Sequence, residues 1–179
     1  MVKLLWENIF KSDQDESGPT AALRSCPIFS ALTHRELKFV SKVIHARTYR
    51  PGEAIFTQNE VGLGMYMLVK GTINISIEEF KEDEPPKLVF ITRLDPGDFF
   101  GEISLVENNG RRTATAIAAD EVLVYGFFKP DLNDIAERNP LIGYKIVSKL
   151  SEVLGRRLQE TARKVALLKK EVLNPTNKI

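Results

Sequence analysis

Apolar and polar residues alternate through the middle of the chain. Ile73, Ile75 and Ile77 are separated by polar residues, and this period of two is typical of a strand with one face in a core. Similar short apolar runs lie before and after it, punctuated by the turn dipeptides Pro51-Gly52 and Pro96-Gly97. They predict further strands at residues 54–58, 65–70, 88–94, 112–118 and 122–127. Short strands at this spacing favour an antiparallel sandwich or barrel over alternating strands and helices.

Helical patterns precede the β region. Thr33 and Glu36 match a capping box, and the apolar residues after them are at helical spacing, which predicts a helix over about residues 33–46. Residues 11–20 are polar and contain a Gly-Pro pair, so they are predicted to be a linker. Residues 1–10 carry apolar side chains at helical spacing. We expect a short amphipathic helix there that packs on its own domain, because it has too little charge and apolar length to bind a membrane well.

A long helical pattern follows the β region. Residues 140–173 have no proline after the first position and predict a helix about 50 Å long. One apolar stripe near its start is expected to face the barrel: Ile142, Ile146, Leu150 and Val153. A later seam has alternating steps of four and three residues: Leu154, Leu158, Thr161, Val165, Leu168 and Val172. Such a seam is typical of a helix that pairs with another helix. A helix this long extends beyond a small barrel, so we expect a homodimer through residues 147–172, with internal packing of the seam as the alternative.

The overall composition narrows the functional classes. The 25 basic and 24 acidic residues leave a net charge of +1, which removes the bulk electrostatic argument for direct contact with nucleic acid. Cys26 is the only cysteine, so an internal disulfide and cysteine-ligated clusters are excluded. No apolar run approaches the roughly 20 residues of a membrane span, and no signal-peptide pattern opens the chain. We therefore expect a cytoplasmic protein without a membrane span. We divide it into an N-terminal segment and linker (1–21), a β-barrel with flanking helices (22–139), and a long helix with a tail (140–179).

One segment carries recognisable chemistry. Gly101-Glu102-Ile103-Ser104 follows a predicted turn, and Arg112 lies at the start of the next predicted strand. Gly101 permits a close approach of the backbone, and a short helical turn beginning there would direct the amides of Ile103 and Ser104 toward an anion. Arg112 supplies a planar, permanently charged fork for phosphate oxygens. Because a carboxylate such as Glu102 accepts hydrogen bonds from sugar hydroxyls, the loop suits a ribose phosphate, although a surface Glu–Arg pair would give the same pattern by itself.

The wider context resembles a known family. Residues 100–105, together with Arg112-Thr113-Ala114, resemble the phosphate-binding cassette of cyclic-nucleotide-binding domains. Residues 110–114 also resemble the cassette of the cyclic-nucleotide-gated channels. Residues 62–71 are similar to the earlier strand–turn segment of that family. Residues 156–161, together with Lys164 and Val165, are similar to the dimerisation helix of the bacterial catabolite activator proteins, whereas Ala162 departs from it. The resemblance covers roughly residues 22–173.

This resemblance implies a fold and a ligand. The fold is mainly β with flanking helices, an antiparallel β jelly-roll barrel followed by a long C-terminal dimerisation helix. The ligand is a cyclic nucleotide inside the barrel. Carried over position by position, Glu102 would hold the ribose 2′-hydroxyl and Arg112 the cyclic phosphate, with the amides of Ile103 and Ser104 beside it. Thr113 would lie next to the phosphate and the base.

The base contacts are implied by residues outside the cassette. Thr161 would reach the base from the long helix, and Arg157, one turn earlier, could stack on it. Ile91 and Thr92 would line the wall of the pocket. The likeness of Thr161 to the activator proteins favours cAMP, whereas a hydroxyl at Thr113 could meet the amino group of guanine, so cGMP is second. Arg111 is an alternative to Arg112 as the phosphate ligand.

Two other classes of function compete with this hypothesis. A β-barrel metal enzyme needs clustered histidines, but His34 and His45 both fall in or beside the helix predicted at 33–46, and no nucleophile–base motif is present. We therefore expect no catalysis. The other alternative is a ligand-independent barrel that serves as a dimerisation or interaction module. We also expect no helix-turn-helix domain after the long helix, so the cyclic-nucleotide sensor would signal through that helix to an effector protein.

Overall fold

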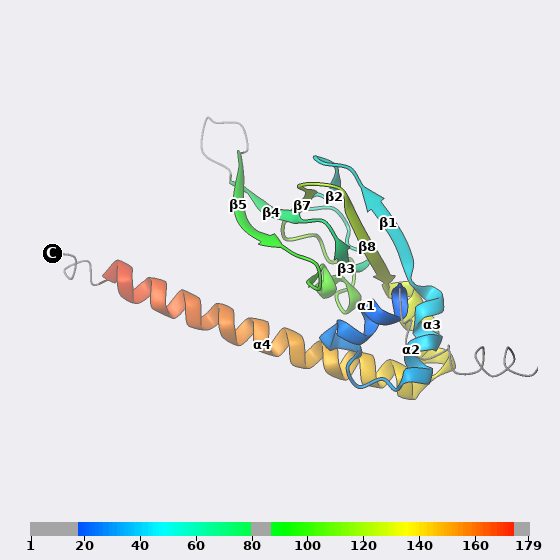
Figure 1. Cartoon of the computed structure of the whole chain (residues 1–179). Helices are drawn as coiled ribbons and strands as arrows, with labels where there is room; N and C mark the ends of the chain where they lie inside the picture. Colours follow the sequence, from blue (N-terminus) through cyan, green and yellow to red (C-terminus); the bar gives the residue numbers. More distant parts are fainter. Residues whose placement is uncertain (1–17, 80–86, 174–179) are drawn as a thin grey trace, which may run out of the picture.

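Two antiparallel sheets of four strands form the centre of the molecule (Figure 1). The structure, a computed structural model, describes residues 18–79 and 87–173. The first sheet has the order β1 (His45–Tyr49), β8 (Val122–Phe128), β3 (Gly64–Lys70), β6 (Phe99–Phe100). The second has the order β2 (Ala54–Phe56), β7 (Thr115–Ala118), β4 (Ile73–Glu79), β5 (Lys87–Leu94). The predicted fold class, a β jelly-roll barrel with flanking helices and a long C-terminal helix, is confirmed.

Two apolar layers lie on opposite faces of the first sheet. Alternate residues of β3 and β8 point into the barrel and pack against β2, β4 and β7 of the second sheet, among them Tyr66, Leu68, Val122 and Val124. The intervening residues pack against the helices outside the barrel: Met65, Met67, Tyr125 and Phe127. Because both faces are covered, β3 is buried along most of its length and reads as a continuous apolar run.

The helix predicted at residues 33–46 is shorter than expected. Helix α2 (His34–Val40) begins at the predicted capping box of Thr33 and Glu36, and a 3-10 turn, η2 (Ser41–Val43), follows it. The chain then enters β1, so His34 starts a helix but His45 starts a strand. Among the described residues, strand β1 is an edge strand whose only partner is β8, and most of its residues are exposed. It therefore lacks the apolar pattern by which β2, β3, β4, β5, β7 and β8 were predicted.

The N-terminal linker also ends earlier than predicted. Helix α1 (Pro19–Ser25) starts inside the segment 11–20, with Gly18 as its N-cap and Pro19 in its first turn, a position that proline favours. The helix predicted for residues 1–10 lies outside the described residues. A 3-10 turn, η1 (Pro27–Phe29), then leads to α2, and helix α3 (Lys129–Arg138) follows β8.

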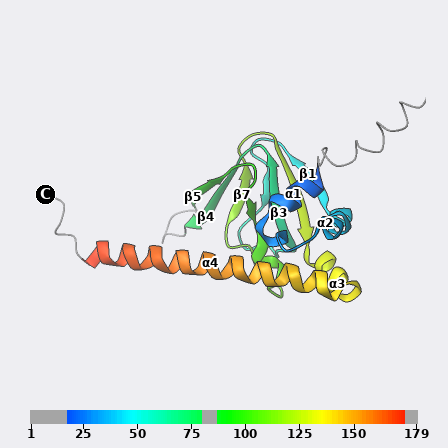
Figure 2. The same cartoon turned by 60° about the horizontal axis from the view of Figure 1, so that its bottom comes forward.

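Helix α4 (Pro140–Leu173) has two halves with different surroundings. The predicted stripe of Ile142, Ile146, Leu150 and Val153 is buried against the outer layer. The C-terminal part of the helix extends away from the barrel (Figures 1 and 2), and the seam residues beyond Arg157 are exposed, 70% for Leu158 and 77% for Val172. Of the predicted seam, Leu154 packs against the buried core, whereas Leu158, Val165, Leu168 and Val172 do not. The alternative that all of the seam packs internally is therefore wrong. Within the described parts of the chain, no helix is long and apolar enough to cross a membrane.

A polar link fixes the first half of α4 to α2. The Lys145 ammonium lies 2.7 Å from the Glu36 carboxylate, and the backbone N–H of Thr33 donates to the same carboxylate at 2.7 Å. These hydrogen bonds, that of Lys145 first, lower the pKa of Glu36. The cap of α2 and the position of α4 thus depend on one carboxylate.

Candidate functional site

A pocket of about 370 Å³ opens beside the loop that follows β6. Its volume lies within the ordinary range for small-molecule sites, about 300–1,000 Å³. One part of its wall is apolar: Phe56, Ile75, Leu94, Phe99 and Phe100. Of the ten residues proposed from the sequence, the pocket brings together Thr92, Gly101, Glu102, Ile103, Ser104, Arg112, Thr113 and Arg157. The other two, Ile91 and Thr161, are not among its lining residues.

Gly101 sets the shape of the loop. Its φ of 75° is left-handed, and it is the N-cap of a 3-10 turn, η3 (Glu102–Leu105). A Cβ at this position would collide with the Arg112 guanidinium, so both the conformation and the space require glycine. Gly62 plays a related part, because a Cβ there would overlap the Ser104 hydroxyl.

Arg112 is the central charge of the site. Its side chain is buried, with only 6% of the residue exposed. Nη1 donates to the Gly101 carbonyl and to the Ser104 hydroxyl, each at 3.1 Å. Among the described residues, no carboxylate forms an ion pair with this guanidinium. Burial lowers the pKa of Arg112, as expected for a cation taken out of water. A permanently charged group that has no direct counter-ion within residues 18–79 and 87–173 therefore lies in the wall of the pocket.

The neighbouring Arg111 has a different environment. It is exposed, its Nη1 donates to the Asn59 carbonyl at 2.6 Å, and its backbone forms a bridge with Val61. Both arginines line the pocket. Only Arg112 is buried against Gly101 and Ser104, and this geometry favours Arg112 over Arg111 as the anion ligand.

An ion pair joins the site to helix α4. Arg157 Nη1 lies 2.6 Å from Glu102 Oε1, and the Glu102 side chain is only 5% exposed. Arg157 Nη2 also donates to the Phe99 carbonyl, and its guanidinium carbon lies 4.5 Å from the centroid of the Phe99 ring. The sequence placed Arg157 near the base but did not indicate this pairing. Thr161, one turn further along, is exposed and donates its hydroxyl to the Arg157 carbonyl at 2.8 Å.

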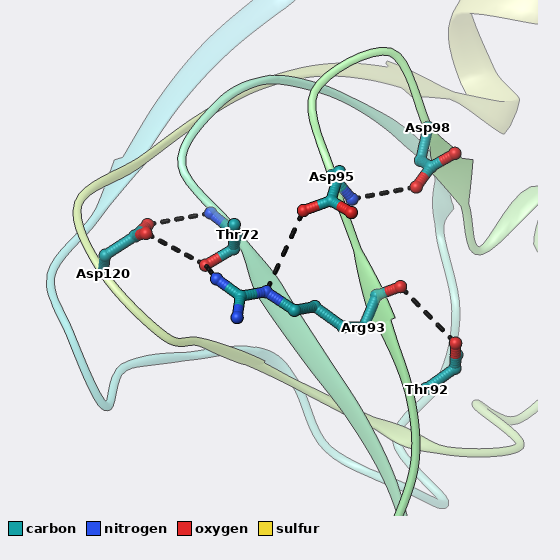
Figure 3. A network of polar contacts seen from close by, with 6 residues as sticks. All are labelled: Thr72, Thr92, Arg93, Asp95, Asp98 and Asp120. Atoms are coloured by element: carbon teal, nitrogen blue, oxygen red, sulfur yellow. Dashed lines mark hydrogen bonds and ion pairs between the residues drawn. The ribbon is translucent and has the colours of Figure 1, made fainter.

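Strand β5 contributes one of its two predicted wall residues. Thr92 pairs with Ile75 across the β4–β5 ladder, and both line the pocket. Ile91 lies at the bulge of this ladder, between the pairs Ile75–Thr92 and Ser76–Phe90, and is half exposed. Figure 3 shows how the end of β5 is held: Arg93 donates to the Thr72 hydroxyl at 2.8 Å, and Thr72 in turn donates to the Asp120 carboxylate. These links fix the strand that carries Thr92.

Several pocket residues were not proposed from the sequence. Phe56, Ile75, Leu94 and Phe99 form apolar wall, and their alternation along strands predicts burial without distinguishing a pocket from a core. Only the register of the two sheets, which the sequence does not state, separates these two environments.

Comparison with known proteins identifies the domain. The sequence profile of the cyclic nucleotide-binding domain matches residues 46–139, the segment that contains the barrel, the Gly101 turn and Arg112. The chain belongs to the cyclic nucleotide-binding domain family. The matched segment contains residues 101–104 and Arg112, whose sequence resembles the phosphate-binding cassette of this family.

Relatives of this domain include transcriptional regulators. The chain is 28% identical over 146 residues to the cyclic AMP receptor protein of Thermus thermophilus. It is 30% identical over 124 residues to the cAMP-activated global transcriptional regulator CRP of Salmonella typhimurium. These matches cover 82% and 69% of this chain, but only 63% and 55% of the relatives. The crystal structure of the Thermus thermophilus catabolite activator protein superimposes with a TM-score of 0.69 at 27% identity, over 82% of this chain and 64% of that one. The comparisons indicate a binding domain and no catalytic family.

Proposed function

We propose that this chain is a non-catalytic cyclic-nucleotide sensor that binds cAMP, with cGMP second. The observation that carries the proposal is the buried Arg112 guanidinium, which lines the pocket without a carboxylate partner among the described residues. A buried cation of this kind is costly unless an anion pairs with it. A cyclic phosphate supplies one negative charge and in-plane oxygens for the guanidinium fork.

In this proposal the cassette holds the ribose phosphate. The phosphate lies against Arg112, beside the backbone of Gly101, Ile103 and Ser104, and Thr113 lies next to it. Glu102 accepts a hydrogen bond from the ribose 2′-hydroxyl. The Glu102 carboxylate already forms an ion pair with Arg157 on α4. The ribose therefore either shares this carboxylate with Arg157 or breaks the ion pair, and in both cases its binding affects α4.

The base is assigned to residues outside the cassette. The names of the regulators from Thermus thermophilus and Salmonella typhimurium refer to cAMP, which supports adenine as the base. Arg157 and Thr92 line the pocket and would contact the base directly. Thr161 and Ile91 do not line it, so a contact with either requires α4 or β5 to move toward the ligand.

The output of the sensor is assigned to α4. A ligand that binds one arrangement of the cassette and α4 more tightly shifts the population toward that arrangement. The exposed seam supports a homodimer through residues 147–172 and signalling to an effector protein, in the cytoplasm. The alternative, a ligand-independent dimerisation or interaction module, uses the same helix but leaves the charge of Arg112 unexplained.

Isothermal titration with both nucleotides tests the proposal. We expect the wild-type chain to bind one cAMP per chain and to bind cGMP more weakly. Tighter binding of cGMP would overturn the choice of base but not the class of ligand. No heat and no displacement of a fluorescent cyclic nucleotide with either ligand would instead support the ligand-independent module.

A further inference from the structure

The Arg112 guanidinium lies against an aromatic ring. Its central carbon is 4.1 Å from the centroid of Phe56, which lies on β2 and lines the same pocket. The ring of Tyr66 is the next aromatic group, at 5.8 Å. A cation within about 6 Å of a ring centroid is attracted by the negative face of the π-system. Phe56 therefore stabilises the position and the charge of this buried group.

An aromatic ring and a carboxylate interact with a guanidinium in different ways. A carboxylate uses the in-plane N–H donors and neutralises the charge, so the arginine loses what an anionic ligand needs. A ring face attracts the guanidinium through its π-system and accepts no hydrogen bond at the in-plane lone-pair positions that a carboxylate would use, so it does not neutralise the charge. Within the described residues, both hydrogen bonds of Arg112 start from Nη1. The donors of Nε and Nη2 thus remain for a ligand in the plane of the group.

Phe56 is itself fixed in place. Its ring stacks on Tyr66, with centroids 6.2 Å apart, and lies 5.7 Å from Phe100. The loop after Phe56 also binds the backbone of Arg112: the Arg112 amide donates to the Glu60 carbonyl at 2.8 Å, and the Asn59 amide donates to the Arg112 carbonyl at 2.9 Å. The same stretch of chain therefore holds both the backbone and the side chain of the arginine.

We propose that Phe56 is a positioning residue for phosphate binding. It holds the Arg112 guanidinium in place without accepting from its N–H groups, so the donors of Nε and Nη2 stay available to the anion. This inference rests on the proposed function only in naming the anion as a cyclic phosphate. The contact between Phe56 and Arg112 exists in the ligand-free protein and can be measured in that state.

The first experiment measures cAMP affinity by isothermal titration for wild type, Phe56→Leu and Phe56→Tyr. Leucine keeps an apolar side chain but removes the π-face, and we expect affinity to fall about five- to twentyfold. Tyrosine keeps the face, and affinity should stay within about twofold of wild type. The matched control is Phe128→Leu, because Phe128 packs edge-on against Tyr66 in the same cluster and does not contact Arg112. Equal affinities of Phe56→Leu and wild type would overturn the proposal, as would equal losses in Phe56→Leu and Phe128→Leu.

The second experiment needs no nucleotide. In 1H–15N spectra of the ligand-free protein, the Arg112 Nε–H signal, identified by its absence in Arg112→Lys, should be shifted upfield by the ring beneath it. Phe56→Leu, or Phe56→Met where leucine does not fold, should remove this shift, whereas Phe128→Leu should keep it. An Arg112 signal that does not change in the Phe56 variants would overturn the positioning role. A shift that depends on Phe56 in a protein that binds neither cAMP nor cGMP would sustain that role and contradict only the proposed function.

Discussion

The two halves of helix α4 share one helix and the same type of apolar spacing, yet they have opposite surroundings. In the first half, Ile146 and Leu150 are fully buried against the barrel layer. In the second half, Leu158 and Val165 face solvent. Arg157 lies at the junction and joins the helix to the cassette through Glu102. Apolar spacing therefore identifies a face that needs a partner, but contacts elsewhere in the chain decide which face already has one.

Truncation in the two halves should affect folding very differently. Ile146→Ala removes buried methyl groups and leaves a cavity, so we expect a loss of about 2–5 kcal/mol in the free energy of unfolding. Leu158→Ala removes atoms that are exposed in the single chain. At a protein concentration low enough for the chain to be monomeric, it should change this free energy by less than about 0.5 kcal/mol. Urea denaturation followed by circular dichroism measures both. Similar losses in the two variants would mean that the second half of α4 packs on its own chain.

A charge introduced into the seam should affect dimerisation and leave folding unchanged. Val165→Glu places a carboxylate in the proposed dimer interface, and we expect a shift from dimer to monomer in sedimentation equilibrium with the fold retained. Arg163→Glu, an exposed change outside the seam, is the control. A wild-type chain that is monomeric at all concentrations would contradict the proposed homodimer.

The ion pair between Arg157 and Glu102 should contribute less to the free energy of unfolding than the buried stripe of α4. Arg157→Ala leaves the buried Glu102 carboxylate without its partner, and because Arg157 is 46% exposed we expect a loss of about 1–2 kcal/mol in stability. Arg156→Ala, next to it and also exposed, should change stability by less than about 0.5 kcal/mol. Thermal unfolding of both variants measures the difference, and equal midpoints would contradict the assigned role of the ion pair.

The smallest effect on stability is expected from the ion pair between Glu36 and Lys145, which joins α2 to the first half of α4 and depends on pH. The pKa of Glu36 is lowered from its usual value near 4.5 by Lys145 and the Thr33 amide. Its contribution to stability is therefore present above that usual value and is lost as the pH falls through the lowered pKa. Glu36→Gln should remove about 0.5–1 kcal/mol of stability at neutral pH and flatten its fall below pH about 4.5. If the stability of Glu36→Gln had the same pH dependence as that of wild type, the stabilising role of Glu36 would be contradicted.

Much of the fold follows from local pattern. The strands with a buried face, the capping box of α2 and the buried stripe of α4 were predicted because alternation and helical spacing report burial directly. Strand β1 was missed because its residues are exposed and its pairing with β8 joins distant parts of the chain. Strand β6, with only two residues, is too short to show a period.

In the candidate site, too, residues that are close in sequence could be predicted, whereas contacts between distant segments could not. Gly101, Glu102 and Arg112 are close in sequence and could be proposed together from a motif. The contact of Phe56 with Arg112 and that of Glu102 with Arg157 join segments far apart in the chain, and only the packing of sheets and helix creates them. The exposed position of Thr161 likewise depends on how far α4 has left the barrel.

The central claim is that buried Arg112, and not exposed Arg111, binds the cyclic phosphate. Isothermal titration of cAMP into Arg112→Ala and Arg111→Ala compares two adjacent arginines that both line the pocket. We predict that Arg112→Ala loses about 2–5 kcal/mol of binding free energy, whereas Arg111→Ala loses less than about 1 kcal/mol. Equal cAMP affinity in wild type and Arg112→Ala would contradict the account.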